Sequence, residues 1–451
     1  MEINNQATKI KAKEKLSFGL ATLGNIPIMI IISTFLLFFY TNIVGLNPAA
    51  VATLFLISRF FDAFVDPLLG YYIDRLPRTK MGRFRMCLMV GAIICSINFM
   101  LLWFGPMWAT AGQLVIAYVT YLLMGITFTI MDIPLNSLIP VMTDDQKERA
   151  SLSGIRGLFS MLGAMLISMI APIILTVIPD QVSAFYILIF GAIAIILICS
   201  LVGVAGVKER IVPTGKVKKY GIKEFFTFLK SGPVFITFFA TVLFGTSTAV
   251  AGASNLFFFT YVIGNVAMMS LVGLFSLVGL IPAIAVSAPL TNRFGKKKMF
   301  VAGLFINGIT TLIRILGITS IPLLIVSVTI SGIGTGFITA LMHNIQADNV
   351  DFIDYKFKFR AEGAIASLSS FAVKTGQAIG GALPGYILAI TGYVPGAVQT
   401  DLATTGIVLS TIVLPAVAMV IAVVIFGLGY KLDGKQIFEI SQTLRERRQE
   451  S

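Results

Sequence analysis

Long, almost continuous apolar runs are the feature of this sequence that most limits how it can fold. A helix needs about 20 residues to cross the hydrocarbon core of a bilayer, where only helices and closed barrels satisfy every backbone polar group. The runs here reach that length, and of the 451 residues 57% are hydrophobic and only 12% are charged. We therefore predict an all-α membrane protein with twelve transmembrane helices. The expected spans lie near 17–40, 48–72, 86–104, 112–135, 153–177, 183–206, 233–261, 267–290, 298–317, 320–345, 362–391 and 404–430.

The distribution of Lys and Arg predicts how these spans are oriented. Basic residues occur at 9–15, 75–85, 147–149, 208–223, 293–298, 356–360 and 445–448, and the six connections on the other side contain none. Cytoplasmic loops retain positive charge, so both termini and the long central connection are expected in the cytoplasm of a multi-pass inner-membrane protein. The formal net charge of +13 then needs no nucleic-acid partner.

The chain also divides into two halves. The connection at 207–232 is rich in Lys and Gly and separates six spans in 1–206 from six in 233–430, with a cytoplasmic tail at 431–451. The turn "GYYIDRLPRTKMGRFRM" after the second span has a counterpart, "APLTNRFGKKKMFVAG", after the eighth. Two basic loops that merely follow the topology rule would explain this echo too. The arrangement resembles the major facilitator superfamily, which implies a solute site between the halves near mid-membrane.

Acidic residues within the second span are the first candidates for function. Asp62 and Asp66 are four residues apart on one helical face, and Arg59 lies one turn earlier. Two such acids cost about 5 to 7 kcal/mol to insert into a membrane. Adjacent carboxylates repel each other unless a cation or a proton intervenes, and hard cations prefer oxygen ligands. The pattern predicts a sodium or proton site, and the alternative is a structural ion pair with Arg59 or another Arg.

Polar residues in three further spans extend this candidate site. Asp132 and Asn136 share one face of the fourth span, with Thr129 on its flank, although Thr and Asn in membrane helices also serve helix packing. Arg156 near the start of the fifth span and Lys374 deep in the eleventh are cations in different halves. Each is expected to meet a carboxylate or a polar solute, or else to form a structural ion pair.

Several motifs together resemble the glycoside-pentoside-hexuronide:cation symporter family. They are "LSFGLATLG", "YTNIVGL", "RFFDAFVDPLLG", "DRLPRTKMGRFR", "TFTIMDIP", "ADNVDFIDY" and "VKTG". The resemblance implies a binding site for the coupling cation, formed by Asp62, Asp66, Thr129 and Asp132. If the cation is Na⁺, the three Asp carboxylates would be its charged ligands. It implies solute contacts from Asp132, Arg156 and Lys374. A cytoplasmic gate is implied at Arg149, Asp348, Asp351 and Arg360.

The first span departs from the family pattern. Galactoside-carrying members have a Lys-Asp pair where this chain has Asn25 and Ile26, and an aromatic residue expected near Asn136 is absent. Asn25 and Asn136 are then candidate solute ligands through their amides. These differences argue against a galactoside and leave the cation residues intact.

The function predicted is secondary active symport of a glycoside, pentoside or hexuronide with Na⁺ or H⁺. No nucleotide motif appears, no cofactor is expected, and the single histidine, His343, cannot form a relay alone. Cys87, Cys95 and Cys199 lie in apolar spans without metal-ligand spacing. One alternative keeps the fold and carries an amphiphile such as a lysolipid or drug. A more distant one is a membrane enzyme or sensor, although no catalytic constellation is present.

Overall fold

The computed structural model describes residues 10–143, 145–211, 227–358, 362–432 and 434–449. Apart from one isolated bridge between Thr79 and Gly82, the regular structure of these residues is helical. The chain divides into two compact units, Met1–Lys216 and Val217–Ser451, called here the N-terminal and the C-terminal unit.

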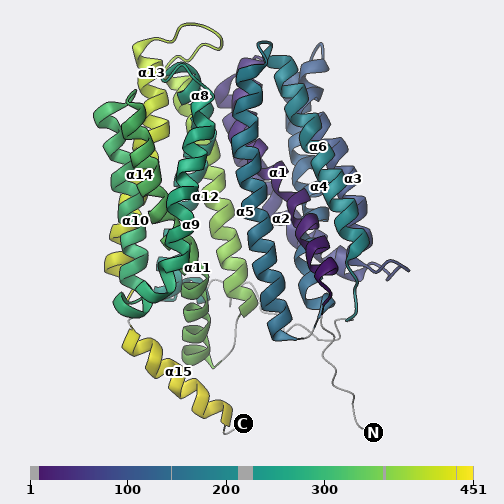
Figure 1. Ribbon diagram of the computed structural model, residues 1–451, viewed down its shortest axis with the longest axis vertical. Coiled ribbons are helices and arrows are strands. Elements are labelled where there is room, and N and C mark those ends of the chain that lie inside the picture. Colours follow the sequence, from purple (N-terminus) through teal and green to yellow (C-terminus); the bar gives the residue numbers. More distant parts are fainter. Residues whose placement is uncertain (1–9, 144, 212–226, 359–361, 433, 450–451) are drawn as a thin grey trace. The chain divides into compact units, whose positions relative to one another are not determined.

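The N-terminal unit contains six long helices (Figure 1). They are α1 (Ala12–Asn42), α2 (Pro48–Arg75), α3 (Phe84–Trp108), α4 (Gln113–Met142), α5 (Gln146–Val177) and α6 (Gln181–Gly206). Asn47, Asp145 and Asp180 begin α2, α5 and α6, and each side chain accepts a hydrogen bond from a backbone N–H of the first turn. Such caps satisfy N–H groups that have no partner within the helix.

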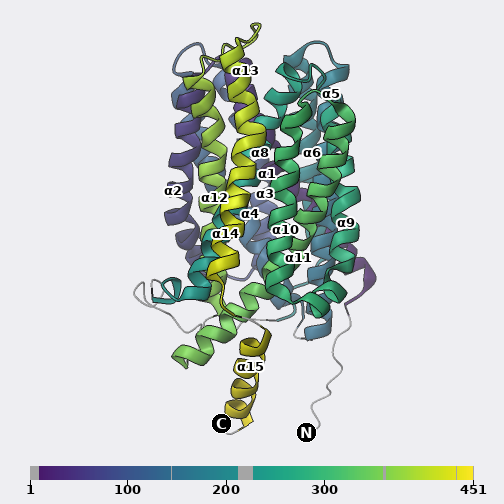
Figure 2. The same ribbon diagram turned by 90° about the vertical axis from the view of Figure 1, so that its left-hand side faces the viewer.

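The C-terminal unit follows the same plan, with one additional helix after the last span (Figure 2). Its elements are α8 (Gly232–Tyr261), α9 (Met268–Phe294), α10 (Lys296–Ile313), η1 (Arg314–Gly317), α11 (Ile321–Phe357), α12 (Glu362–Ile390), α13 (Asp401–Val408), η2 (Leu409–Val413), α14 (Leu414–Gly429) and α15 (Gly434–Gln449). The π-helical turn η2 joins α13 to α14 within one long span.

Ten helices in the described part of the chain are long and apolar enough to cross a membrane. The other two predicted spans correspond to α2 and α12, of 28 and 29 residues, which carry the acids of the second span and Lys374. The prediction of an all-α membrane protein is confirmed. Of the predicted linker, residues 212–226 lie outside the described residues, and the predicted tail forms α15.

Some helices continue well beyond the apolar segments that marked them in the sequence. The tenth span was expected to end at residue 345, and α11 continues to Phe357, giving a helix about 55 Å long. Hydropathy locates only the apolar part of a helix, whereas the backbone hydrogen-bond ladder continues into polar surroundings. Asp348 and Asp351 therefore lie on a regular helix and not in a loop.

Close packing between helices depends on small residues. In the C-terminal unit α9 approaches α11 so closely at Gly279 that a Cβ there would overlap the backbone oxygen of Thr329. Helices in membranes associate through such small-residue contacts, because lipid offers no hydrophobic driving force between them.

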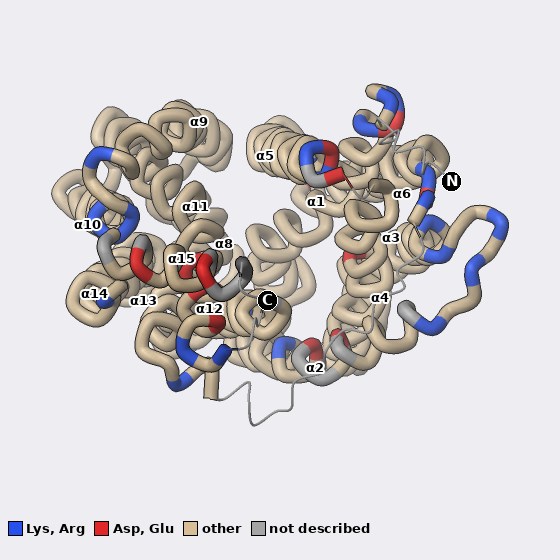
Figure 3. Tube along the Cα trace, turned by 90° about the horizontal axis from the view of Figure 1, so that it is seen from below, with Lys and Arg blue, Asp and Glu red and all other residues tan. Residues whose placement is uncertain are grey.

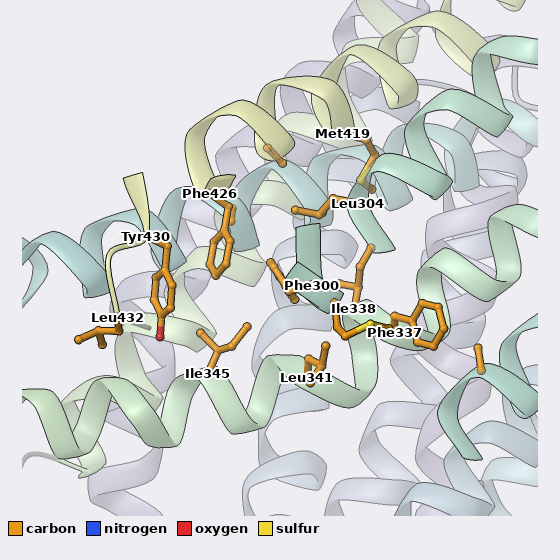
Figure 4. Packing of buried hydrophobic residues seen from close by; sticks show 14 of the residues in the cluster. Phe300, Leu304, Phe337, Ile338, Leu341, Ile345, Met419, Phe426, Tyr430 and Leu432 are labelled. Atoms are coloured by element: carbon orange, nitrogen blue, oxygen red, sulfur yellow. The ribbon is translucent and has the colours of Figure 1, made fainter. Parts of the chain in front are cut away.

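A cluster of buried hydrophobic residues in the C-terminal unit joins α10, α11, α14 and α15 (Figure 4). Phe300 of α10, Ile345 of α11 and Phe426 of α14 meet there, and the rings of Phe426 and Tyr430 stack at 4.5 Å. Ile440 and Leu444 of α15 are buried in the same cluster. These contacts attach α15 to the other helices of the C-terminal unit.

Seen from below, Lys, Arg, Asp and Glu residues are visible in both units (Figure 3). In the N-terminal unit Lys15 pairs with Glu148 at 2.7 Å, and Arg210 pairs with Glu14 at 2.7 Å. The Glu209 carboxylate accepts hydrogen bonds from the backbone N–H groups of Arg83, at 3.0 Å, and Arg85, at 2.7 Å. The connection between α2 and α3 is thus held by the segment that follows α6.

Candidate functional site

The two acids of α2 both contact α4. Asp62 is buried, its Oδ2 lies 3.3 Å from Arg59 Nη1, and a Cβ at Gly125 of α4 would overlap its Oδ1. One turn further on, Thr129 Oγ1 of α4 donates a hydrogen bond to Asp66 Oδ1 at 2.7 Å. Gly125 and Thr129 are four residues apart, so they share a face of α4 just as the two acids share a face of α2.

A cavity of about 20 Å³ lies beside Asp62. Its polar lining comes from Ser58, Arg59 and Asp62 of α2 and from Tyr121 of α4, and two apolar residues of α1 close it. This volume holds one water-sized particle. The carboxylate therefore lies beside a space suited to a single water or a small cation.

Asp132 forms a second polar cluster one turn beyond Thr129. Asn25 Nδ2 of α1 donates to its Oδ1 at 3.2 Å, and Asn136 Nδ2 donates to its Oδ2 at 2.8 Å. Arg156 of α5 acts electrostatically on the same carboxylate. Three helices thus contribute to one carboxylate, and the cluster offers amide, carboxylate and guanidinium groups to a polar ligand.

The described residues do not gather Asp62, Asp66 and Asp132 around one point. No group of three His, Cys, Asp or Glu close enough to share a metal ion occurs in the described ranges. The structure instead forms two neighbouring clusters, Asp66 with Thr129 and Asp132 with Asn25. A single ion shared by all three acids stays a prediction.

Comparison with known proteins identifies the family of this chain. The model of the family described as MFS/sugar transport protein matches residues 17–434. The chain belongs to this family. It is a transporter and not an enzyme, and the predicted membership in the glycoside-pentoside-hexuronide:cation symporters is confirmed.

Three curated relatives of the family match almost the whole chain. An isoprimeverose transporter of Lactiplantibacillus pentosus is 31% identical over 93% of this chain and 88% of its own length. A glucuronide carrier protein homolog of Escherichia coli is 30% identical over 90% and 89%, respectively. An uncharacterized symporter of Bacillus subtilis is 29% identical over 97% and 96%.

Solved structures support the fold of this family transporter. A bacterial homolog of the human lysosomal transporter Spinster has a TM-score of 0.70 at 16% identity, covering 96% of this chain and 99% of the other. The predicted major facilitator fold is confirmed.

The remaining predicted solute and gate residues of this family member lie on several helices. Lys374 is on α12, partly buried, in the C-terminal unit, and Asp351 is partly buried on α11. Arg149 of α5 donates to backbone oxygens, that of Thr143 at 2.8 Å and that of Pro140 at 3.5 Å. Arg360 lies outside the described residues.

Sequence reasoning missed the partner of Asp348. Its carboxylate is bound by Lys296 Nζ of α10, at 2.6 Å to Oδ1 and 2.8 Å to Oδ2. Lys296 appeared in the sequence only as part of a basic turn. Tyr121 and Gly125 were missed as well, since an aromatic residue and a glycine in an apolar helix look like ordinary packing residues.

Proposed function

We propose that this transporter is a secondary active symporter that moves a glycoside, pentoside or hexuronide together with Na⁺ or H⁺. Alternating access between two states of the protein would couple the two fluxes. The observation that carries the proposal is the hydrogen bond from Thr129 to Asp66, one helical turn from Asp62. Two carboxylates of α2 and one hydroxyl of α4 thus lie within about one helical turn of each other where the two helices pack together. Oxygen ligands of this kind suit a hard monovalent cation or a proton.

The Asp132 cluster is the proposed solute site of the N-terminal unit. Its carboxylate accepts hydrogen bonds from sugar hydroxyls, while the amides of Asn25 and Asn136 both donate and accept. Arg156 adds a guanidinium for a ring oxygen or a carboxylate. Lys374 is the proposed solute contact of the C-terminal unit.

The solutes named for two relatives indicate which kinds of saccharide this transporter could carry. One is a transporter of isoprimeverose, a neutral saccharide, and another is a homolog of a glucuronide carrier, whose solute is anionic. The same helical framework thus serves solutes of different charge. We propose a saccharide and expect the choice between a neutral and an acidic sugar to depend on Arg156 and Lys374.

Uptake into proteoliposomes tests the proposal. Purified protein is reconstituted, an inward Na⁺ or proton gradient is imposed, and labelled isoprimeverose, a labelled glucuronide and a labelled lysolipid are offered in parallel. Saturable, gradient-driven accumulation of one sugar is expected. Transport of the lysolipid alone, or sugar flux indifferent to both gradients, would contradict the proposal.

We also propose that both termini face the cytoplasm, because the Lys and Arg residues lie in the connections on that side. Single cysteines placed at Gly45 or Gly392, in a chain from which the native cysteines have been removed, should react with an impermeant reagent outside intact cells. A cysteine at Lys80 should react only after the cells are broken. Labelling of position 80 in intact cells would reverse the orientation.

A further inference from the structure

A second small cavity lies within the C-terminal unit. Its volume is about 20 Å³, and α8, α11 and α12 all contribute to it. Five of its lining residues are polar: Thr237, Thr241, Gln346, Asn349 and Ser369. Five polar side chains beside one cavity between three membrane helices need an explanation, because buried polar atoms without partners are costly in such surroundings.

Asn349, one of the lining residues, carries a buried atom without a hydrogen-bond partner in the described part of the chain. The residue is 1% exposed, its Nδ2 donates to Thr237 Oγ1 at 3.0 Å, and its Oδ1 has no hydrogen-bond partner among the described residues. The orientation of the amide is fixed by Thr237, whose own hydroxyl donates to the backbone oxygen of Pro233 at 2.8 Å and can only accept from Asn349. The unsatisfied atom is therefore an acceptor.

The other lining groups supply what a single bound molecule would need. The Ser369 hydroxyl accepts a hydrogen bond from Gln346 Nε2, so its own hydrogen is available as a donor. The Thr241 hydroxyl donates to the backbone oxygen of Thr237 at 2.8 Å, which keeps a lone pair available as an acceptor. The Ser369 hydroxyl is then one donor, and the Thr241 hydroxyl and Asn349 Oδ1 are two acceptors. Together they match the three hydrogen bonds that a buried water typically makes.

We propose that this cavity binds one water molecule, which bridges α8, α11 and α12 through Thr241, Asn349 and Ser369. The volume fits a single water. All five polar lining side chains are neutral, and Ser369 presents a hydrogen, so a water suits the site better than a cation does. The carboxylate next in sequence, Asp348, is already bound by Lys296.

Radiolytic footprinting with isotopically labelled water tests the site in the full-length purified protein. Irradiation splits a bound water into a hydroxyl radical, which adds to the ring of the cavity residue Phe238 and leaves the oxygen of that water on it. After rapid mixing with ¹⁸O water, bulk-facing aromatic residues should take up ¹⁸O at once, whereas Phe238 should carry ¹⁶O first and ¹⁸O only after a delay. Absence of oxidation, or immediate ¹⁸O at Phe238, would overturn the proposal.

A pair of matched variants links the label to the unsatisfied amide. Asn349→Leu removes the acceptor and should abolish the slowly exchanging label at Phe238. Asn344→Leu makes the same change at an exposed position of α11 and should leave that label intact. If Asn349→Leu does not fold, Ser369→Ala removes the donor and should reduce the same signal. A label retained in every folded cavity variant, or one that disappears when Na⁺ replaces choline, would refute a bound water.

Discussion

Replacing Asp66 by Asn is the most direct test of ion coupling in this transporter. The change removes one charge while leaving an oxygen that still accepts the hydrogen bond of Thr129, now 2.7 Å from the carboxylate. A membrane potential of 100 mV drives one elementary charge with about 2.3 kcal/mol. At about 1.4 kcal/mol per tenfold, one coupled cation sustains roughly a fiftyfold solute gradient, and we expect Asp66→Asn to lower this accumulation toward equilibrium.

Concentrative uptake and solute exchange should be measured in the same vesicles. Exchange need not be lost in the variant, because the proposed solute site at Asn25, Asp132 and Arg156 is a separate cluster. Asp180→Asn is the matched control, since Asp180 makes its hydrogen bonds at the exposed start of α6. Full cation-driven accumulation by Asp66→Asn would show that this carboxylate is not part of the coupling site.

Three other predictions follow from the geometry. Arg156→Ala and Lys374→Ala should each abolish solute uptake while membrane insertion stays normal, and wild-type uptake would make the residue structural. Gly125→Ala places a methyl group against the neighbouring α2 carboxylate, at a cost of about 1 to 3 kcal/mol, and should weaken cation stimulation of uptake without changing the amount of inserted protein. Lys296→Met leaves Asp348 without its cation and should lower the thermal unfolding temperature in detergent, by more than Lys297→Met does.

The sequence predicted those features of the site that depend on periodicity within one helix. Asp62 and Asp66 lie four residues apart, and they do share a helical face that meets α4. Hydropathy found the helices because it is a property of consecutive residues. It could not show that α11 continues past residue 345, since the added turns are polar and are held by backbone hydrogen bonds.

Contacts between distant helices were beyond sequence reasoning. Asn25 and Asp132 are 107 residues apart, and Lys296 and Asp348 are 52 apart. Nothing in the local pattern around either residue selects its partner, because several buried acids and several amides are available. The packing of whole helices makes that selection. The resemblance to a family supplied the set of polar residues, and the structure supplied how they are paired.

The two clusters in the N-terminal unit are linked by α4. Thr129 contacts Asp66, while Asp132, three residues later on the same helix, contacts Asn25. The two positions are separated by a rise of about 4.5 Å on one rigid helix, so a movement of this turn of α4 on cation binding would reach Asp132 as well as Thr129. Linkage is reciprocal: if cation binding at Asp66 strengthens solute binding at Asp132, the solute must strengthen cation binding by the same factor. In the proposed symporter, this turn of α4 is the structural link through which the two ligands would be coupled without direct contact between them.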